Sequence, residues 1–292
     1  MSPETLIGME LGKSVVQRLL GQGTMGAVYL ALQGERQVAI KVFLPASALE
    51  PGEHEEFLKR LDDIIEQSAS LNHPHILHIL DHGKQANMVY QITPYIAGES
   101  LETLLNRTGA LPLSQIQLYL EQLAMALDYA HTQGVLHRDI KPGNILLAAD
   151  GKLLLSDFSV ASLTTEKNFA RARRAVPGML DTIAPEYVLG KAIDPRADLY
   201  SLGAVVYQMV TGRPLFQGAS LGEVAMKHIK SIPPSPCSLR SDLPGATEQV
   251  IKRAQPKRPD QQGASRSACW RRERVARPAV SGAESRECRC RF

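Results

Sequence analysis

"LHRDIKPGN", residues 136–144, is the stretch of sequence that decides the fold. It places four charged or titratable side chains and one amide within eight residues, directly after a segment with a helical apolar pattern. A loop this polar is too costly to bury without partners, so it indicates a site that meets a ligand. Asp139 can accept or orient a hydroxyl proton, Lys141 can neutralise a phosphoryl group in transfer, and Asn144 can bind a magnesium ion. The stretch alone also fits a surface turn with chance charges, so the neighbouring motifs have to separate the two interpretations.

A β-hairpin is predicted directly downstream. "ILLAADGKLLLSD", residues 145–157, has two short apolar runs that flank a turn at Asp150 and Gly151. The hairpin places Asn144 just before one strand and Asp157 just after the other, so the two side chains should meet at the same end. An amide oxygen and a carboxylate are hard ligands that suit Mg²⁺.

The clearest predicted helix lies upstream, over residues 113–134. Ser114 and Gln117 have the spacing of a capping box, and Gly134 ends the pattern. Apolar residues recur at intervals of three and four, namely Ile116, Leu120, Leu123 and Leu127. This stripe indicates a helical core in the second half of the chain.

The first half of the sequence is rich in strands. A small antiparallel sheet is predicted from the β-branched and aromatic runs "SVVQRLL", "AVYLALQ", "RQVAIKVFL" and "MVYQITPYI". "HEEFLKRLDDIIEQSASL", residues 54–71, interrupts these runs with helical spacing. A strand-rich front and a helix-rich back predict an α+β fold.

"GQGTMGAV", residues 21–28, contains Gly21, Gly23 and Gly26, and it is followed by a further strand. A dinucleotide-binding fold would continue with a helix, so the glycines indicate a hairpin tip that covers phosphates. Lys41 lies on the next strand and could hold those phosphates with its ammonium group. Either feature alone has an ordinary explanation, a flexible hairpin or a solvent-facing lysine. Together with the polar loop they predict a nucleotide site.

Composition and charge narrow the class of protein. A hydrophobic content of 44% in 292 residues excludes disorder throughout the chain. The first residues lack a signal-peptide pattern, and the longest charge-free runs are too short to span a membrane. All four cysteines, Cys237, Cys269, Cys288 and Cys290, lie in the last fifth of the chain. We therefore expect a cytoplasmic protein without a membrane span.

Taken in their order along the chain, these motifs resemble those of the bacterial, eukaryotic-like (Hanks-type) serine/threonine protein kinases. They are "GQGTMGAV", "VAIK", "HRDIKPGN", "DFS", "APE" at 184–186 and "DLYSLG" at 198–203. The resemblance implies a two-lobed kinase fold. The N-lobe, residues 14–96, would hold the small antiparallel sheet and one long helix, and the larger, mainly helical C-lobe would cover residues 97–255.

The resemblance also implies an ATP-dependent serine/threonine protein kinase that uses Mg²⁺, with Asp139, Lys141 and Asn144 as catalytic residues. Lys141, two residues after Asp139, is similar to the serine/threonine pattern. Asn144 and Asp157 would hold the metal. The ATP-binding residues would be Leu20, Gly21, Gly23, Gly26, Val28, Ala39, Lys41, Thr93, Pro94, Ile96, Leu146 and Asp157. The expected partners are ATP and a protein substrate, with no specific nucleic acid; the oligomeric state is left open.

Two departures from the family pattern leave an alternative function open. The glutamate that the family pairs with Lys41 falls on Ile64, and Asp63 or Glu66 would reach Lys41 only if the helix slipped or rotated. Otherwise they form a solvated acidic face with Asp62. Met179 stands where the family usually has a threonine that bonds to the catalytic loop. The alternative is a pseudokinase that acts as a nucleotide-binding scaffold or regulator.

The segment after Asp157 carries the predicted regulation. Ser159 replaces the glycine of the family tripeptide, which leaves metal binding intact but biases the loop between conformers. Thr164 and Thr165 are the expected phosphate acceptors, and a phosphate there could pair with Arg138.

The C-terminal segment, residues 256–292, departs from the family. From Lys252 onward there are 12 Lys/Arg against 4 Asp/Glu, and apolar periodicity is lost. The segment is expected to be a disordered basic tail for an anionic partner, or an out-of-frame or truncated terminus. An arginine partner for Glu186 cannot be placed, and Gln262 stands near its expected position. Cys288 and Cys290 lack a matching pair, which argues against a zinc site.

Overall fold

The computed structural model describes residues 3–23, 26–43, 51–85, 88–158 and 180–255. Its first half forms a six-stranded sheet in the order β1-β2-β3-β4-β6-β5, and every neighbouring pair is antiparallel. This confirms the predicted antiparallel sheet. A short 3₁₀ helix, η1 (Pro3–Leu6), precedes the strands, which are β1 (Glu10–Leu11), β2 (Ser14–Gly23), β3 (Gly26–Gln33), β4 (Arg36–Phe43), β5 (Asp81–Gln85) and β6 (Met88–Pro94).

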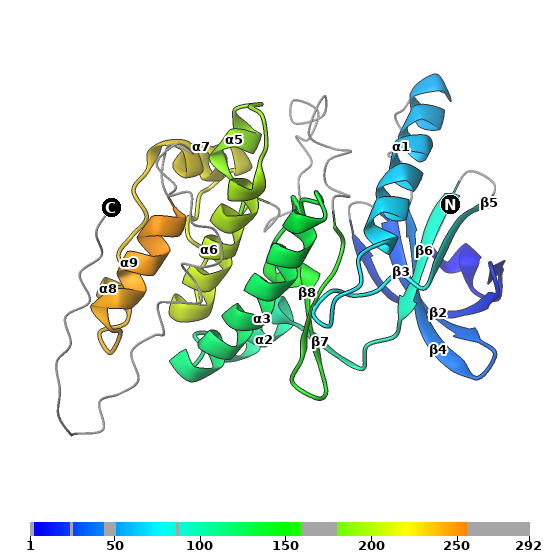
Figure 1. Cartoon of the computed structure of the whole chain (residues 1–292), viewed down its shortest axis with the longest axis horizontal. Helices are drawn as coiled ribbons and strands as arrows, with labels where there is room; N and C mark the ends of the chain where they lie inside the picture. Colours follow the sequence, from blue (N-terminus) through cyan, green and yellow to red (C-terminus); the bar gives the residue numbers. More distant parts are fainter. Residues whose placement is uncertain (1–2, 24–25, 44–50, 86–87, 159–179, 256–292) are drawn as a thin grey trace.

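The two faces of this sheet are covered by different parts of the chain, because side chains alternate along each strand. On one face Tyr29, Ile40 and Ile92 pack with Leu6 and Leu11 from the N-terminal residues. On the other face Phe43 and Val89 pack with Leu61 and Ile65 of α1 (Pro51–Ala69). Figure 1 shows α1 lying along the sheet. The helix predicted over 54–71 is therefore confirmed, with its start three residues earlier.

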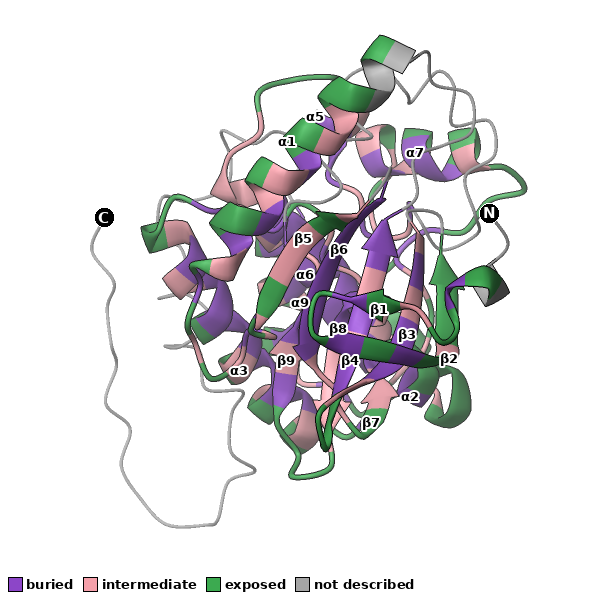
Figure 2. Cartoon of the chain, turned by 90° about the vertical axis from the view of Figure 1, so that its right-hand side faces the viewer, coloured by how far each residue is buried: buried purple, intermediate pink, exposed green. Residues whose placement is uncertain are grey.

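The second half is mainly helical and has its own core. The helices are α2 (Leu101–Thr108), α3 (Leu113–Thr132), α5 (Pro185–Val188), α6 (Pro195–Thr211), α7 (Leu221–Lys230), α8 (Pro236–Leu239) and α9 (Gly245–Ala254). The central helices α3 and α6 supply most of the fully buried residues of this core. Figure 2 shows buried residues concentrated in the strands of the six-stranded sheet, in front of these helices. None of the helices in the described ranges combines the length and the apolar content that a membrane crossing requires.

The N-terminus of α3 differs from the predicted capping box. The N-cap is Pro112, which has no side chain to cap the helix, and its carbonyl accepts a hydrogen bond from Ile116 N at 3.0 Å. Ser114 therefore lies inside the first turn, too late to cap it. Gln117 instead donates to Glu121 on the exposed face at 3.3 Å. The predicted helix is confirmed, but its cap was wrong because Pro112 starts the helix earlier.

The predicted hairpin is present beside the helical core. β8 (Ile145–Ala148) pairs antiparallel with β9 (Leu153–Leu155), and β7 (Gly98–Ser100) completes a three-stranded sheet. Gly151 has φ 82°, a backbone conformation that residues other than glycine rarely adopt. This explains why glycine follows aspartate in the turn. The 3₁₀ helix η2 (Pro142–Asn144) leads directly into β8. Asn144 and Asp157 thus lie at the same end of the hairpin.

Candidate active site

The polar loop 137–144 is fixed by one buried carboxylate, Asp198, at the start of α6. Its oxygens accept hydrogen bonds from the backbone N–H groups of His137 and Arg138, both at 2.8 Å, and from His131 Nε2 at 2.8 Å. Arg138 has φ 70°, which costs a non-glycine residue on the order of 1 kcal/mol. The carboxylate therefore holds the loop in a backbone conformation that it would not adopt alone.

His137 links this loop to the strand that precedes Asp157. Its Nε2 donates to Ser156 O at 2.9 Å, and its Nδ1 accepts from Asp139 N at 3.2 Å. Burial lowers the pKa of His137, although nearby aspartates act in the opposite direction, so the ring is neutral at neutral pH. The ring also contacts Phe158, with centroids 4.5 Å apart. His137 therefore connects the loop to the residues on either side of Asp157, namely Ser156 and Phe158.

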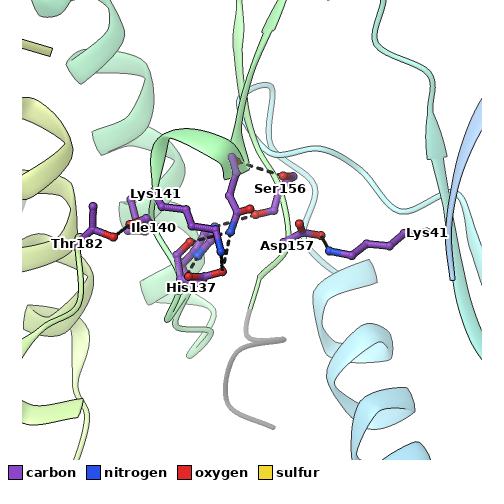
Figure 3. A network of polar contacts seen from close by, with 9 residues as sticks. Lys41, His137, Ile140, Lys141, Ser156, Asp157 and Thr182 are labelled. Atoms are coloured by element: carbon purple, nitrogen blue, oxygen red, sulfur yellow. Dashed lines mark hydrogen bonds and ion pairs between the residues drawn. The ribbon is translucent and has the colours of Figure 1, made fainter. Parts of the chain in front are cut away.

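Asp139, Lys141 and Asn144 converge within the loop. Lys141 Nζ lies 2.6 Å from Asp139 Oδ2, and Asn144 Nδ2 donates to the same oxygen at 2.9 Å and to Asp139 O at 2.8 Å. Figure 3 shows Lys141 and His137 within this network of polar contacts, with Ser156 beside them. The arrangement gives Asp139 a fixed orientation and places a cation next to it.

Lys41 reaches this network from the sheet. Its Nζ lies 2.7 Å from Asp157 Oδ1, and Figure 3 shows the two side chains pointing toward each other across the space between β4 and β9. Burial by itself raises the pKa of Asp157, but the ammonium of Lys41, which also donates a hydrogen bond, outweighs burial and holds that pKa below its ordinary value. Asp157 is thus ionised at neutral pH. Its backbone has φ 63°, in the left-handed region that residues other than glycine rarely adopt. Residues distant in sequence come together here as predicted.

Val28, Ala39 and Thr93, which are predicted to bind the nucleotide, lie on the face of the sheet that carries Lys41, whereas Pro94 is paired with Val38 on the other face. Strand register pairs Val28 with Lys41, Ala39 with Thr93, and Gly21 with Val28. Gly23 faces Gly26 at the hairpin tip, Pro94 ends β6, and Leu20 lies on β2. Ile96 follows β6, and Leu146 lies on β8 of the three-stranded sheet. Of these residues, Thr93 lines a small cavity together with Asp157.

Comparison with known proteins identifies the family. The model of the protein kinase domain matches residues 14–266. The chain belongs to the protein kinase family. The serine/threonine-protein kinase PknA of Mycobacterium tuberculosis is 37% identical over 260 residues, which cover 86% of this chain and 58% of PknA. PknH of the same organism is 32% identical over 264 residues, 90% of this chain and 41% of PknH. This chain therefore spans only about half the length of these curated relatives.

Solved structures agree with this family. The crystal structure of the PknI kinase domain of Mycobacterium tuberculosis is 29% identical, with a TM-score of 0.72, and the match covers 90% of this chain and 96% of that one. A point variant of the same PknI domain matches with a TM-score of 0.70 at 28% identity. The two-lobed kinase fold, a sheet-containing N-lobe and a helical C-lobe, is thereby shown.

The donor atoms of the kinase site fit a magnesium ion. Asn144 uses its amide nitrogen toward Asp139, so its amide oxygen is the atom left for a metal. Asp157 supplies a carboxylate from the adjacent strand end. Hard oxygen donors of this kind, together with phosphate oxygens, are the set that Mg²⁺ prefers.

The N-lobe helix departs from the family pattern as its sequence predicts. Ile64 packs partly buried near Phe43 and Leu61, and among the described residues the ion-pair partner of Lys41 is Asp157. Asp63 and Glu66 are exposed. Asp62 is half-buried and lies 2.9 Å from Lys84 Nζ, so it is paired with β5 and not simply solvated.

Several predictions concern residues outside the described ranges. They are the conformational role of Ser159, the phosphate acceptors Thr164 and Thr165, the position of Met179, the neighbour Gln262 and the pair Cys288 and Cys290. Glu186 is described: it is 5% exposed and has no ion pair within the described residues. Burial raises its pKa, with Asp194 adding to the effect.

Two residues of the kinase site escaped sequence reasoning. Asp198 lies within the quoted "DLYSLG" motif. Its hydrogen bonds to the loop could not be predicted because the loop lies about 60 residues earlier in the sequence. Thr182 Oγ1 donates to Ile140 O at 2.7 Å and is buried. Figure 3 shows Thr182 reaching the loop from the opposite side to Lys41. Thr182 stands three residues after Met179, and it ties the segment before α5 to the catalytic loop.

Proposed function

We propose that this kinase chain transfers the γ-phosphate of ATP to serine and threonine hydroxyls of protein substrates. The observation that carries the proposal is the convergence of Lys41 and Asp157 at 2.7 Å beside the fixed group of Asp139, Lys141 and Asn144. Phosphoryl transfer needs little covalent chemistry from the protein and depends mainly on positioning and charge stabilisation. The site contains groups suited to both tasks.

Each residue has a role in this proposal. Asp139 orients the attacking hydroxyl and accepts its proton, and Lys141 stabilises negative charge on the phosphoryl group in transfer. Lys41 binds the phosphates from the N-lobe. Asn144 and Asp157 would hold Mg²⁺, which when bound neutralises charge on the phosphate oxygens.

The adenine site and the limits of the lobes complete the proposal. Thr93 lies at the back of the pocket, Pro94 offers a carbonyl and Ile96 an N–H group to adenine, and Leu146 packs from below. The glycine hairpin covers the phosphates. We assign residues 14–96 to the N-lobe, 97–255 to the C-lobe, and 256–292 to a separate basic segment.

A nucleotide-binding pseudokinase is the second candidate, and one specific observation favours it. Ile64 occupies the helix position from which the family's glutamate would hold Lys41, and Lys41 contacts Asp157 instead. If this ion pair persisted with nucleotide present, the chain would bind ATP without transferring phosphate.

Transfer of radiolabelled γ-phosphate to itself and to a generic basic protein separates the two candidates. We expect magnesium-dependent labelling that falls by orders of magnitude in Asp139→Asn. Asp150→Asn, in the exposed hairpin turn, is the matched control and should label like wild type. Wild-type labelling no higher than that of Asp139→Asn would reject the enzyme and favour the scaffold.

A further inference from the structure

Lys41 lacks the helix carboxylate that would hold it in place, since Ile64 is apolar. One turn later, Ser68 directs its hydroxyl to Ile64 O at 2.7 Å and toward Phe158 O at 3.4 Å, not to Lys41. Among the described residues the sole ion-pair partner of Lys41 is Asp157, the proposed metal ligand. A second group is therefore needed to orient the ammonium while Asp157 is engaged elsewhere.

Gln91 is placed to supply that group. It lies on β6 directly opposite Lys41 on β4, so the two side chains leave the same face of the sheet. Directly opposed Cβ atoms in antiparallel strands are about 4.5–5.5 Å apart, within the reach of a lysine and a glutamine side chain. The row Val28, Lys41, Gln91 thus carries two polar residues side by side.

The environment of Gln91 makes its polarity unexpected. The residue is only 6% exposed and lies in a strand whose other residues are mostly apolar. A polar side chain in so buried a position usually has a hydrogen-bonding role, because burying an amide is costly unless it finds a partner. Gln91 lines a small cavity together with Ser68, Thr93, Asp157 and Phe158. The cavity thus joins Gln91 to the carboxylate that Lys41 contacts.

We propose that Gln91 is the positioning residue for Lys41 and replaces the missing helix carboxylate. Its amide oxygen accepts a hydrogen bond from the Lys41 ammonium and directs it toward the phosphates of ATP. Because the amide is neutral, the full positive charge of Lys41 remains available to the ligand. This inference rests on the proposed function only in so far as Lys41 binds ATP, and it does not require phosphate transfer.

Equilibrium binding of ATP with Mg²⁺, measured by calorimetry in an Asp139→Asn background, tests the inference without turnover. Gln91→Leu keeps the size of the side chain but removes its acceptor, and we expect about tenfold weaker ATP binding, approaching that of Lys41→Met. Gln91→Glu retains an acceptor at the same place and should bind ATP clearly more tightly than Gln91→Leu. In the transferring protein, Gln91→Leu should raise KM for ATP more than it lowers kcat.

A matched control separates positioning from general destabilisation. Gln255→Leu removes another buried glutamine amide, whose Nε2 donates to Tyr200 O at 2.9 Å in the C-lobe. It should lower the melting temperature but leave ATP affinity unchanged. The inference is overturned if Gln91→Leu binds ATP like its parent, or if Gln91→Glu is weakened as much as Gln91→Leu. Absence of ATP binding in the parent would instead count against the proposed function.

Discussion

Replacing Asp198 with asparagine should destabilise the catalytic loop more than any other single conservative change in the C-lobe. Asp198 Oδ1 accepts from Arg138 N, and Oδ2 accepts from His137 N and His131 Nε2, each at 2.8 Å. Asparagine keeps one acceptor oxygen and turns an NH₂ group toward the remaining donors. If the oxygen stays with Arg138, two charge-assisted bonds are lost at about 1.5–3 kcal/mol each.

The expected loss in unfolding free energy is therefore about 3–6 kcal/mol, a large part of the roughly 5–15 kcal/mol typical of a folded domain. Urea denaturation followed by circular dichroism measures it, with an unchanged m-value as the sign that the same surface unfolds. Asp194→Asn, at the partly exposed N-cap of the same helix, is the control; it keeps a capping side chain and loses only a partly exposed ion pair with Arg196, so it should change stability by about 1 kcal/mol or less. Equal midpoints for the two variants would refute this reasoning.

Three further variants test other parts of the account. Thr182→Val leaves Ile140 O without its 2.7 Å partner and should lower the unfolding free energy by about 1–3 kcal/mol in urea, whereas an unchanged midpoint would remove Thr182 from the loop's support. Gly26→Ala would place a Cβ 1.9 Å from Val42 O, so we expect the glycine hairpin to shift and KM for ATP to rise severalfold; wild-type KM would contradict this. Because the folded-state pKa of Glu186 is raised above its ordinary 4.5, ionisation weakens the fold as pH rises through the raised value. Glu186→Gln should therefore melt higher than wild type at about pH 8 and lose this advantage below the ordinary pKa, and the opposite trend would show a hidden partner for Glu186.

Local patterns in the sequence were enough to predict the main elements. The β8–β9 hairpin followed from an Asp-Gly turn between apolar runs, and α3 followed from its apolar stripe, because both signals depend on neighbours in the chain. The predicted cap of α3 was wrong because two helix-start signals, Pro112 and Ser114, lie within three residues of each other. The helix starts after Pro112. Placing Ile64 on the helix opposite Lys41 required only counting along a regular motif.

Contacts between distant segments left no local signal. Asp198 bonds to a loop residue 60 positions away in the sequence, and Thr182 bonds to one 42 positions away. The identity of an aspartate or a threonine does not indicate which distant residue it will contact. Gln91 lies within an apolar strand, so the sequence shows that it is an isolated polar residue. The sequence does not show that Lys41 lies opposite it. The register of β4 against β6 is the observation that pairs Gln91 with Lys41.

Magnesium-dependent binding of ATP is the most direct measurement of the central claim that Lys41, Asn144 and Asp157 surround one nucleotide and its metal. Calorimetry with and without Mg²⁺ should show that the ion tightens ATP binding by the wild-type chain. Asp157→Asn should lose that tightening, whereas Lys41→Met should bind more weakly but still respond to Mg²⁺. Wild-type binding that ignores Mg²⁺, or an Asp157→Asn variant that keeps the full response, would contradict the account.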